Sequence, residues 1–345
     1  MRSFYLKLLL FFPFLFSSPL FSWGLLQGKV ASEHADERNQ FVRSLYRVYD
    51  PFYLGPLLAP GAHTVPKRAW NIQPYFDIQR NYGVYNADWR LIRSSSSMKF
   101  TYLSAIQYGL TDFLDANISV QMFTNRNGNQ STFGYGDTPL AIGLQLLEGE
   151  VGTWIPSCKA SFSINIPTGK YKHGSQSKLG TDMMGSGLFS PQISINFQKS
   201  FNTLFKKNIN TNDYHPFRFR WSFSYQLNPS VYVSGFNTYG GNSLTRGRVT
   251  PGNNFSTIFA WEYSLNKNWV FATDWLYTVT APSRFKGVTG GATVGGPGNQ
   301  NFSVAPALEY SINSKFGVLA GVQLSLTGRN SSAFTTGLFS FTWLF

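Results

Sequence analysis

Apolar and polar residues alternate with a period of two along most of the chain from residue 69 onward. In the clearest stretch, FRFRWSFSYQL (217–227), every second residue is aromatic or leucine, and Arg218 and Arg220 lie among the polar residues between them. Successive side chains of a β-strand point to opposite faces of the sheet, so this period predicts strands with one apolar and one polar face. The chain from residue 69 is therefore predicted to be all-β.

Twelve segments carry this pattern, and they predict strands near residues 69–81, 99–110, 114–124, 136–147, 157–167, 188–199, 217–239, 254–265, 269–283, 301–312, 316–328 and 333–345. Some connections between them are tight, such as LTDF, NKN and NSK. Others are long and rich in Gly, Ser and Asn: 82–98, 125–135, 168–187, 240–253 and 284–300. Mostly alternating short and long connections are typical of bacterial outer-membrane barrels, which have short periplasmic turns and longer external loops.

The predicted fold is an antiparallel transmembrane β-barrel of about 12 strands, of the outer-membrane type, over residues 69–345. In hydrocarbon every backbone polar group must pair within the protein, and strands achieve this only in a closed sheet. The apolar faces then contact lipid and the polar faces line a lumen. A soluble β-sandwich also alternates, but it buries its apolar faces against a second sheet, and it requires neither an export signal nor aromatic residues on every strand.

Composition agrees with strands that are apolar on one face only. Charged residues make up 13% of the chain, against about 25% in soluble proteins, while aromatic residues reach 17% and the mean hydropathy is −0.15. No internal run of about 18 apolar residues is present, so no transmembrane helix is predicted beyond the N-terminus. The net charge is +13, but Lys and Arg are scattered, which favours contact with anionic lipid and lipopolysaccharide over nucleic acid.

Residues 1–22 have the parts of a secretory signal peptide. Arg2 and Lys7 are basic, residues 8–16 form an apolar core, and small residues follow from Ser17. A retained anchor helix is the alternative, but the apolar stretch is short for a membrane span. We therefore expect export to the bacterial outer membrane. The single cysteine, Cys158, cannot form an internal disulfide.

Residues 23–68 do not alternate. Apolar positions between Val30 and Tyr49 predict a short helix that ends at Asp50-Pro51, and the Pro/Gly-rich connector YLGPLLAPGAHTVPKR follows. Three interpretations stay open for this segment: it plugs the lumen, it lies in the periplasm, or it is a poorly ordered tail.

The last seven residues, FSFTWLF, are unusually apolar for a chain end. Phe339, Phe341, Trp343 and Phe345 alternate with Ser340, Thr342 and Leu344. Soluble chains usually end in polar residues that fray in water. The alternation instead predicts that this segment is the closing strand of the barrel, with its aromatic side chains against lipid.

Three stretches carry a resemblance to a known family. FGYGDTPLAIGLQLL and SFSINIPTGKYKHGSQSKLGTDMMGSGLFSPQISINF contain a Gly-x-Gly-Asp strand opening, a strand ending in Pro-Thr-Gly and a Gly-rich loop, and VAPALEYSINSKFGVLAGVQLSLTGRN is similar to a final hairpin. Together they resemble the bacterial outer-membrane family labelled MetA-pathway of phenol degradation, over most of residues 70–345. The resemblance implies a transporter-like barrel without established catalytic residues. The terminal aromatic strand separately resembles the signal read by the barrel-assembly machinery, which implies that machinery as a partner.

The polar strand faces direct a set of charged residues toward the lumen: Asp77, Lys99, Arg218, Arg220, Glu262, Asp274 and Glu309. Either these charges are solvated or paired and keep the interior wet, or the two arginines oppose the last three acidic residues across a constriction that orders polar solutes. The predicted function is an outer-membrane pore or transporter that passes small molecules through a polar lumen. The alternative is a structural or surface-interaction barrel with a closed lumen.

No catalytic, cofactor or metal site is predicted. None of the four histidines has a His or Cys partner at ligand spacing, and IPTGKY lacks the earlier glycine of a phosphate-binding loop. A hydrolase in the barrel wall would need a base beside a hydroxyl nucleophile, and no histidine lies on a predicted strand. We expect a protein that is not an enzyme.

Overall fold

In the computed structural model, residues 53–149, 154–201 and 215–345 are described. The predicted signal peptide and the predicted helix that ends at Asp50-Pro51 lie outside these residues. Within them, no helix has the length and the apolar character that crossing a membrane would require.

The strands of the described residues are, in chain order, β1 (Trp70–Tyr85), β2 (Leu91–Gly109), β3 (Leu114–Asn127), β4 (Gln130–Tyr135), β5 (Thr138–Leu147), β6 (Ser157–Ile166), β7 (Ser190–Phe201), β8 (Phe217–Gln226), β9 (Val231–Ser234), β10 (Arg246–Thr250), β11 (Asn254–Ser264), β12 (Trp269–Thr280), β13 (Arg284–Val288), β14 (Asn299–Ser311), β15 (Phe316–Arg329) and β16 (Ser331–Leu344). One short 3-10 turn, Gln176–Lys178, lies in the connection between β6 and β7.

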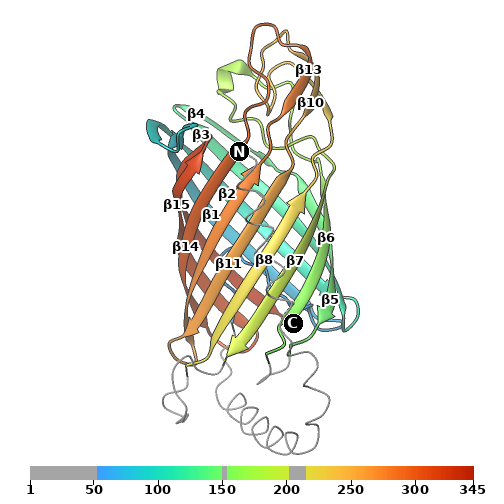
Figure 1. Cartoon of the computed structure of the whole chain (residues 1–345), viewed down its shortest axis with the longest axis vertical. Helices are drawn as coiled ribbons and strands as arrows, with labels where there is room; N and C mark the ends of the chain where they lie inside the picture. The colour runs from blue at the N-terminus through green and yellow to red at the C-terminus, as the bar shows by residue number, and fades with distance from the viewer. Residues whose placement is uncertain (1–52, 150–153, 202–214) are drawn as a thin grey trace, which may run out of the picture. The chain divides into compact units, whose positions relative to one another are not determined.

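The strands close into a barrel (Figure 1). Each neighbouring pair is antiparallel, and the ring closes because β1 pairs with β16 on one side and with β2 on the other. The segments β4 and β5 pair with successive stretches of β3, so together they occupy one strand position of the barrel. Each such strand position is here called a stave. Counted in this way, the barrel has 12 staves, and the predicted fold is confirmed. Closure leaves no strand edge unpaired within lipid.

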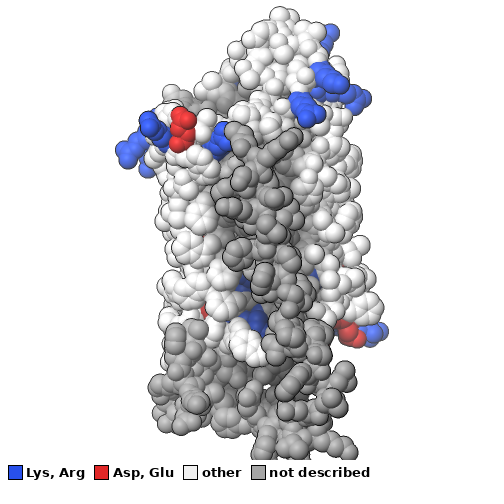
Figure 2. All heavy atoms as spheres, viewed as in Figure 1, with Lys and Arg blue, Asp and Glu red and all other residues white. Residues whose placement is uncertain are grey.

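The two faces of the wall differ as the alternation predicts. On β8, Trp221 and Tyr225 are 47% and 43% exposed, whereas Arg220 is 6% exposed. Aromatic pairs lie where strands begin or end beside the short turns: the rings of Trp70 and Tyr108 are 4.5 Å apart, and those of Trp269 and Tyr310 are 4.7 Å apart. On the face shown in Figure 2, the part of the wall that is not covered by grey atoms is mostly free of charged side chains between the two ends. This distribution suits a wall that contacts lipid beyond an aromatic girdle at the short-turn end.

The C-terminal strand closes the ring against the first strand. Trp70 and Phe345 exchange two backbone hydrogen bonds, of 2.8 and 3.0 Å. Phe339, Trp343 and Phe345 are between 44% and 51% exposed on the outer face, and Phe341 is partly covered by its contact with a ring of β15. The terminal segment is therefore a wall strand with outward aromatic residues.

Two predicted connections are wrong because strands of the wall extend through them, and two others, 240–253 and 284–300, contain the short strands β10 and β13. Residues 82–98 were expected to be a loop, but β1 and β2 continue until a turn at 86–90, where the Asn86 side chain accepts hydrogen bonds from the backbone of Asp88 and Arg90. Residues 125–135 are likewise mostly strand, with a tight turn at Gly128. Above the lipid both faces of a strand meet water, so the alternation that reveals strands disappears while backbone pairing continues.

The predicted strand 217–239 is also wrong in its second half. The stave β8 ends at Gln226, and β9 leaves the barrel to pair with β10. Apolar and polar residues alternate on both sides of Pro229, so the sequence pattern does not reveal that the wall strand ends before it.

The long connections build a cap over one end of the barrel (upper end in Figure 1). Within it β9, β10 and β13 form a separate three-stranded sheet. Buried apolar residues give this cap its own core: Leu188, Val231, Val233 and Val249, with Tyr171, Tyr239, Phe285 and Val294 packed around them. The cap is thus a small apolar-cored layer at the end that carries the long loops.

Candidate channel interior

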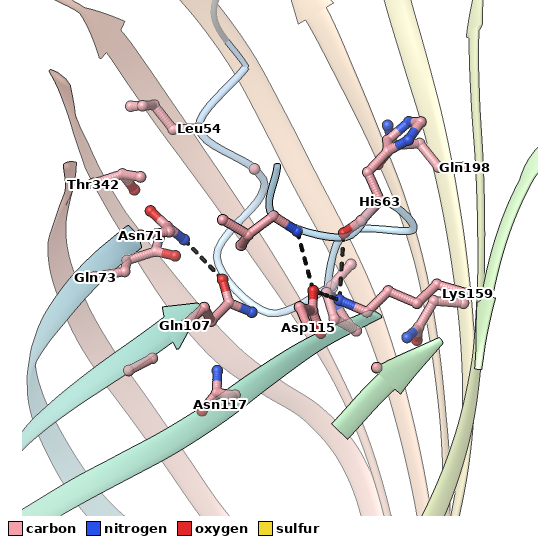
Figure 3. A pocket seen from close by; sticks show the side chains of 18 of the residues that line it. Leu54, His63, Asn71, Gln73, Gln107, Asp115, Asn117, Lys159, Gln198 and Thr342 are labelled. Carbon is pink, nitrogen blue, oxygen red and sulfur yellow. Dashed lines mark hydrogen bonds and ion pairs between the residues drawn. The ribbon is translucent and has the colours of Figure 1, made fainter. Parts of the chain in front are cut away.

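Residues 53–66, here called the luminal segment, run through the inside of the barrel without pairing as a strand of the wall. Their side chains and backbone contact inward-facing residues of staves on different sides of the ring, including β3, β7, β12 and β14. Figure 3 shows the chain looping between the walls. An irregular chain in this position must satisfy its backbone donors with side chains, because no neighbouring strand does so.

Two carboxylates hold the first half of the luminal segment. Glu309 on β14 accepts a hydrogen bond from the backbone nitrogen of Leu54 at 2.8 Å. Asp274 on β12 accepts two, from the backbone nitrogens of Ala59 at 2.9 Å and Leu58 at 3.2 Å. Both carboxylate side chains are fully buried. A carboxyl oxygen can accept more than one hydrogen bond, so these two side chains are the main polar anchors of this half.

The two arginines of β8 contact both the wall and the luminal segment. Arg220 forms a two-pronged ion pair with Glu262 of the neighbouring stave β11, with nitrogen–oxygen distances of 2.9 and 3.2 Å. Its third nitrogen donates to the backbone oxygen of Ala59 at 3.5 Å. The guanidinium of Arg218 lies 4.0 Å from the centre of the Tyr53 ring. The positive charges therefore face either a wall carboxylate or the luminal segment.

A second ion pair anchors the other half. Lys159 on β6 and Asp115 on β3 are 2.6 Å apart and both buried. Asp115 accepts a hydrogen bond from the backbone nitrogen of Val65 at 3.2 Å, and Lys159 donates to the backbone oxygen of His63 at 3.3 Å. Sequence reasoning missed this pair, although each residue lies on the polar face of a predicted strand, which was the available signal.

Two glutamine side chains complete the attachment. Gln145 on β5 accepts from the backbone nitrogen of Thr64 at 2.9 Å and donates to the backbone oxygen of Ala62 at 2.8 Å. Gln198 on β7 accepts from the backbone nitrogen of Ala62 at 3.4 Å. Each glutamine side chain supplies the backbone of the luminal segment with hydrogen bonds that a neighbouring strand would otherwise provide.

A small apolar contact accompanies the polar ones. Leu54 and Leu57 pack against the inner wall, in a buried cluster whose other members are Ala272, Ala305, Ala307, Leu319 and Leu338. Gly317 of β15 makes room for the first of them, because a β-carbon there would lie 2.5 Å from Leu54. One on Gly321 would lie 2.5 Å both from Leu57 and from the backbone oxygen of Pro306 on β14. The wall is thus shaped to receive these two leucines.

A cavity of about 520 Å³ remains between the luminal segment and the wall (Figure 3). Carboxamide side chains are prominent in its lining, which includes Asn71, Gln73, Gln107, Asn117, Asn196 and Gln198. Each carboxamide offers both donors and an acceptor, so the space suits polar solutes of either character.

The structure separates the seven charged residues that the sequence directs inward. Arg218 and Arg220 line the cavity, whereas Glu262, Asp274 and Glu309 are covered completely. Lys99 lies elsewhere on the wall, with its ammonium 3.8 Å from the centre of the Phe123 ring. One carboxylate oxygen of Asp77 is buried and has no hydrogen-bond partner among the described residues. That these residues line a conducting path stays a prediction.

His63 is the one residue of the luminal segment that belongs to the types Asp, Glu, His, Lys or Arg. Burial lowers its pKa to about 4, and the nearby charges of Arg218, Arg220 and Lys159 act in the same direction. One ring nitrogen lies 3.2 Å from the hydroxyl of Ser157. At neutral pH the imidazole is therefore uncharged, as its cationic surroundings require.

The family model described as "Putative MetA-pathway of phenol degradation" matches residues 59–343. Among solved structures, an outer membrane channel from Pseudomonas putida F1 is 14% identical, with a TM-score of 0.60 over 84% of this chain and 100% of that one. The CymD monoaromatic hydrocarbon channel is 10% identical, with a TM-score of 0.38 over 81% of this chain and 89% of that one. A search of curated proteins found no match. At 14% identity the Pseudomonas putida structure supports the barrel fold alone.

Proposed function

The chain belongs to the family described as "Putative MetA-pathway of phenol degradation", and from this premise and its interior we propose that it is a gated outer-membrane channel for small solutes. The luminal segment is the gate. In the structure it lies inside the barrel and is bonded to several strands of the wall, and its release opens the lumen. The protein then exchanges solutes between the outside and the periplasm without catalysing a reaction.

The observation that carries this proposal is how the luminal segment is attached. It is held by side chains of the wall, with carboxylates and glutamines bonded to its backbone, and it forms no wall strand of its own. Each such bond contributes only about 0.5–3 kcal/mol net, because water replaces it when the segment leaves. The segment can therefore detach while the barrel ladder stays intact.

Release also completes the constriction that the sequence predicts. With the luminal segment withdrawn, Asp274 and Glu309 lose their backbone donors and face the lumen on the same side of the ring as Arg218 and Arg220, on strands two and three places from β8. Fixed charges of both signs across a narrow passage orient polar solutes and set ion preference. We therefore assign the predicted constriction to the open state and keep Asp77 and Lys99 as further lumen-lining candidates.

The cavity lining supports a solute class. Carboxamides exchange hydrogen bonds with hydroxyl groups in either direction, and the adjoining surface of the luminal segment contributes apolar residues such as Leu57 and Val65. Small hydroxyl-bearing solutes fit this mixture, and phenol, which the family description names, is one of them.

Two observations bear on the alternatives. A closed structural barrel would have no use for a polar cavity beside a detachable segment, although it shares every feature of the wall. A hydrolase would need an activated base, and the Ser157–His63 contact is the nearest arrangement among the residues described. The depressed pKa of His63 makes it a weak base, and no described carboxylate bonds its second ring nitrogen.

Liposome swelling tests the channel. Vesicles containing the full chain should swell in phenol or a small polyol, and Asp274→Ala, which frees two backbone nitrogens of the luminal segment, should swell faster. Equal rates for empty vesicles, the wild-type protein and Asp274→Ala would favour the closed structural barrel.

We further propose that the terminal aromatic residues Phe339, Phe341, Trp343 and Phe345 mark the chain for the barrel-assembly machinery. The exposed position of Phe345 at the end of the closing strand supports this role. Deleting Phe345 should lower the amount of protein in the outer membrane, measured by quantitative blotting of membrane fractions. Unchanged amounts would show that the residue serves only as packing against lipid.

A further inference from the structure

A groove of about 580 Å³ lies on the outer wall, where β1, β2 and β16 meet. Its floor includes Gly337, whose neighbours in the chain, Thr336 and Leu338, are buried on the inner side. Gly337 pairs with Ile78, which is 51% exposed. The position of these residues places the groove outside the barrel, so its ligand is independent of what passes through the lumen.

A β-bulge shapes the groove. The pairing of β1 with β2 runs from Asn81 opposite Ser97 directly to Gly83 opposite Arg93. One residue of β1 and three serines of β2 are thereby left out of the ladder. Bulges of this kind redirect side chains and end local pairing. The serine run 94–97, which resembles a loop in the sequence, is thus a strand irregularity that presents hydroxyl groups at the wall.

The groove is basic and rich in donors. Its polar lining residues are Arg80, Tyr82, Arg93, Ser94, Ser96 and Thr335. Arg80 and Arg93 are exposed, and neither forms an ion pair with a described residue. Arg126 extends the basic surface, because Met98 pairs with Arg80 on one side and with Arg126 on the other. Two guanidinium groups beside several hydroxyls match the oxygens of a phosphate group.

The height of the groove on the wall identifies the source of that phosphate. Trp70 marks the girdle at the short-turn end, and Arg80 follows ten residues later on the same strand. Ten strand residues extend about 33 Å, which is about 25 Å along the axis of a barrel whose strands tilt by about 40°. The apolar band of such barrels is about 25 Å tall, so Arg80 lies at its outer edge, beside the headgroups of the external leaflet.

We propose that this groove binds a phosphate of an outer-leaflet glycolipid, namely the lipid A portion of lipopolysaccharide. The guanidinium groups of Arg80 and Arg93 contact the phosphate, the serine hydroxyls of the bulge donate to its remaining oxygens, and the acyl chains extend over the apolar wall below Ile78. The site lies on the first and last strands, so the bound lipid also covers the seam at which the barrel closes.

Binding of purified lipid A by the full chain in detergent, titrated by native mass spectrometry, tests the site. Bisphosphorylated lipid A should bind more tightly than the same lipid with its phosphates removed. The double variant Arg80→Gln/Arg93→Gln should weaken binding of the phosphorylated lipid roughly tenfold, because each charge-assisted bond is lost. Its matched control, Arg246→Gln/Arg248→Gln, removes the same charge from exposed positions on β10 of the cap and should leave affinity unchanged.

Three results would overturn the proposal: an unchanged affinity in the Arg80/Arg93 variant, an equal loss in the cap control, or full displacement of lipid A by millimolar inorganic phosphate, which would identify a site for the free anion. A heat-modifiable gel shift establishes that each variant is folded. Should the Arg80/Arg93 variant fail to fold, the wild-type protein decides: its affinity for lipid A must fall as NaCl is raised, and an affinity independent of salt contradicts a phosphate site.

Discussion

The two ends of the barrel are built in opposite ways. The cap at the long-loop end has an apolar core in which Val233 and Val249 are completely buried, and its backbone is paired in a sheet of its own. The luminal segment near the other end has no sheet and is fixed by polar side chains, with Asp274 and Glu309 bonded to its backbone nitrogens. One end therefore carries a small folded layer with an apolar core, and the other contains an irregular segment that polar side chains of the wall hold in place.

This difference decides which end opens. Exposing an apolar core to water costs about 25 cal/mol for every Å² of apolar surface, and nothing in the solvent compensates for it. Buried charges and amides, in contrast, regain water when their partners leave, so breaking such contacts has a smaller net cost. We therefore expect the cap to stay in place and the luminal segment to move.

The largest effect should come from placing a charge in the core of the cap. Val249→Asp would bury a carboxylate without a partner, at a cost of more than about 3 kcal/mol to the cap. Limited proteolysis should then cut within residues 227–253 while the gel shift of the barrel is retained. Resistance equal to that of the wild-type protein would contradict an independent apolar-cored cap.

Removing the main polar anchor should release the luminal segment strongly. Asp274→Ala leaves the backbone nitrogens of Leu58 and Ala59 without their acceptor, a loss of about 3 kcal/mol, or roughly a hundredfold in the docking equilibrium. The measurement is the rate of maleimide labelling of Ala59→Cys in a Cys158→Ser background. A labelling rate that does not change would show that the anchor carries no docking energy.

Filling the space reserved for a leucine should have a smaller effect. Gly317→Ala places a methyl group against Leu54, whose side chain supplies the three nearest atoms, and should cost about 1–3 kcal/mol of docking, seen as faster labelling at position 59. The matched control is Gly337→Ala, because a β-carbon there meets nothing within 4 Å. Equal rates for both variants would exclude a shaped contact between Leu54 and the wall.

The smallest effect should be a pH dependence carried by His63. Its pKa is lowered to about 4 when docked and returns toward its ordinary value of about 6.5 on release, so the released segment binds more protons between these values. Lowering the pH from 7.5 to 5 should favour release by roughly tenfold more in the wild-type protein than in His63→Gln, by the same labelling assay. The same pH response in both proteins would assign it to the wall carboxylates instead.

The strands of the wall could be predicted from the sequence because lipid on one side of the wall requires a strict alternation of apolar and polar residues. Trp221 and Tyr225 on one face and Arg220 on the other are placed as the alternation predicts. The strand predictions were wrong where the chain no longer contacts lipid, at residues 82–98 and in β9 above the barrel. The inward direction of Arg220, Glu262 and Asp274 follows from the same alternation, but their partners do not. The luminal segment binds through backbone groups, and its sequence has no period that reveals which side chains receive it.

The most direct test of the account is single-channel conductance in planar bilayers of the full chain and of a variant lacking residues 53–66. The wild-type protein should show low conductance with transitions to a larger level, and the deletion variant should remain at the larger level, with no transitions. A deletion variant that is folded by gel shift but conducts no more than the wild-type protein would contradict the luminal segment as the gate.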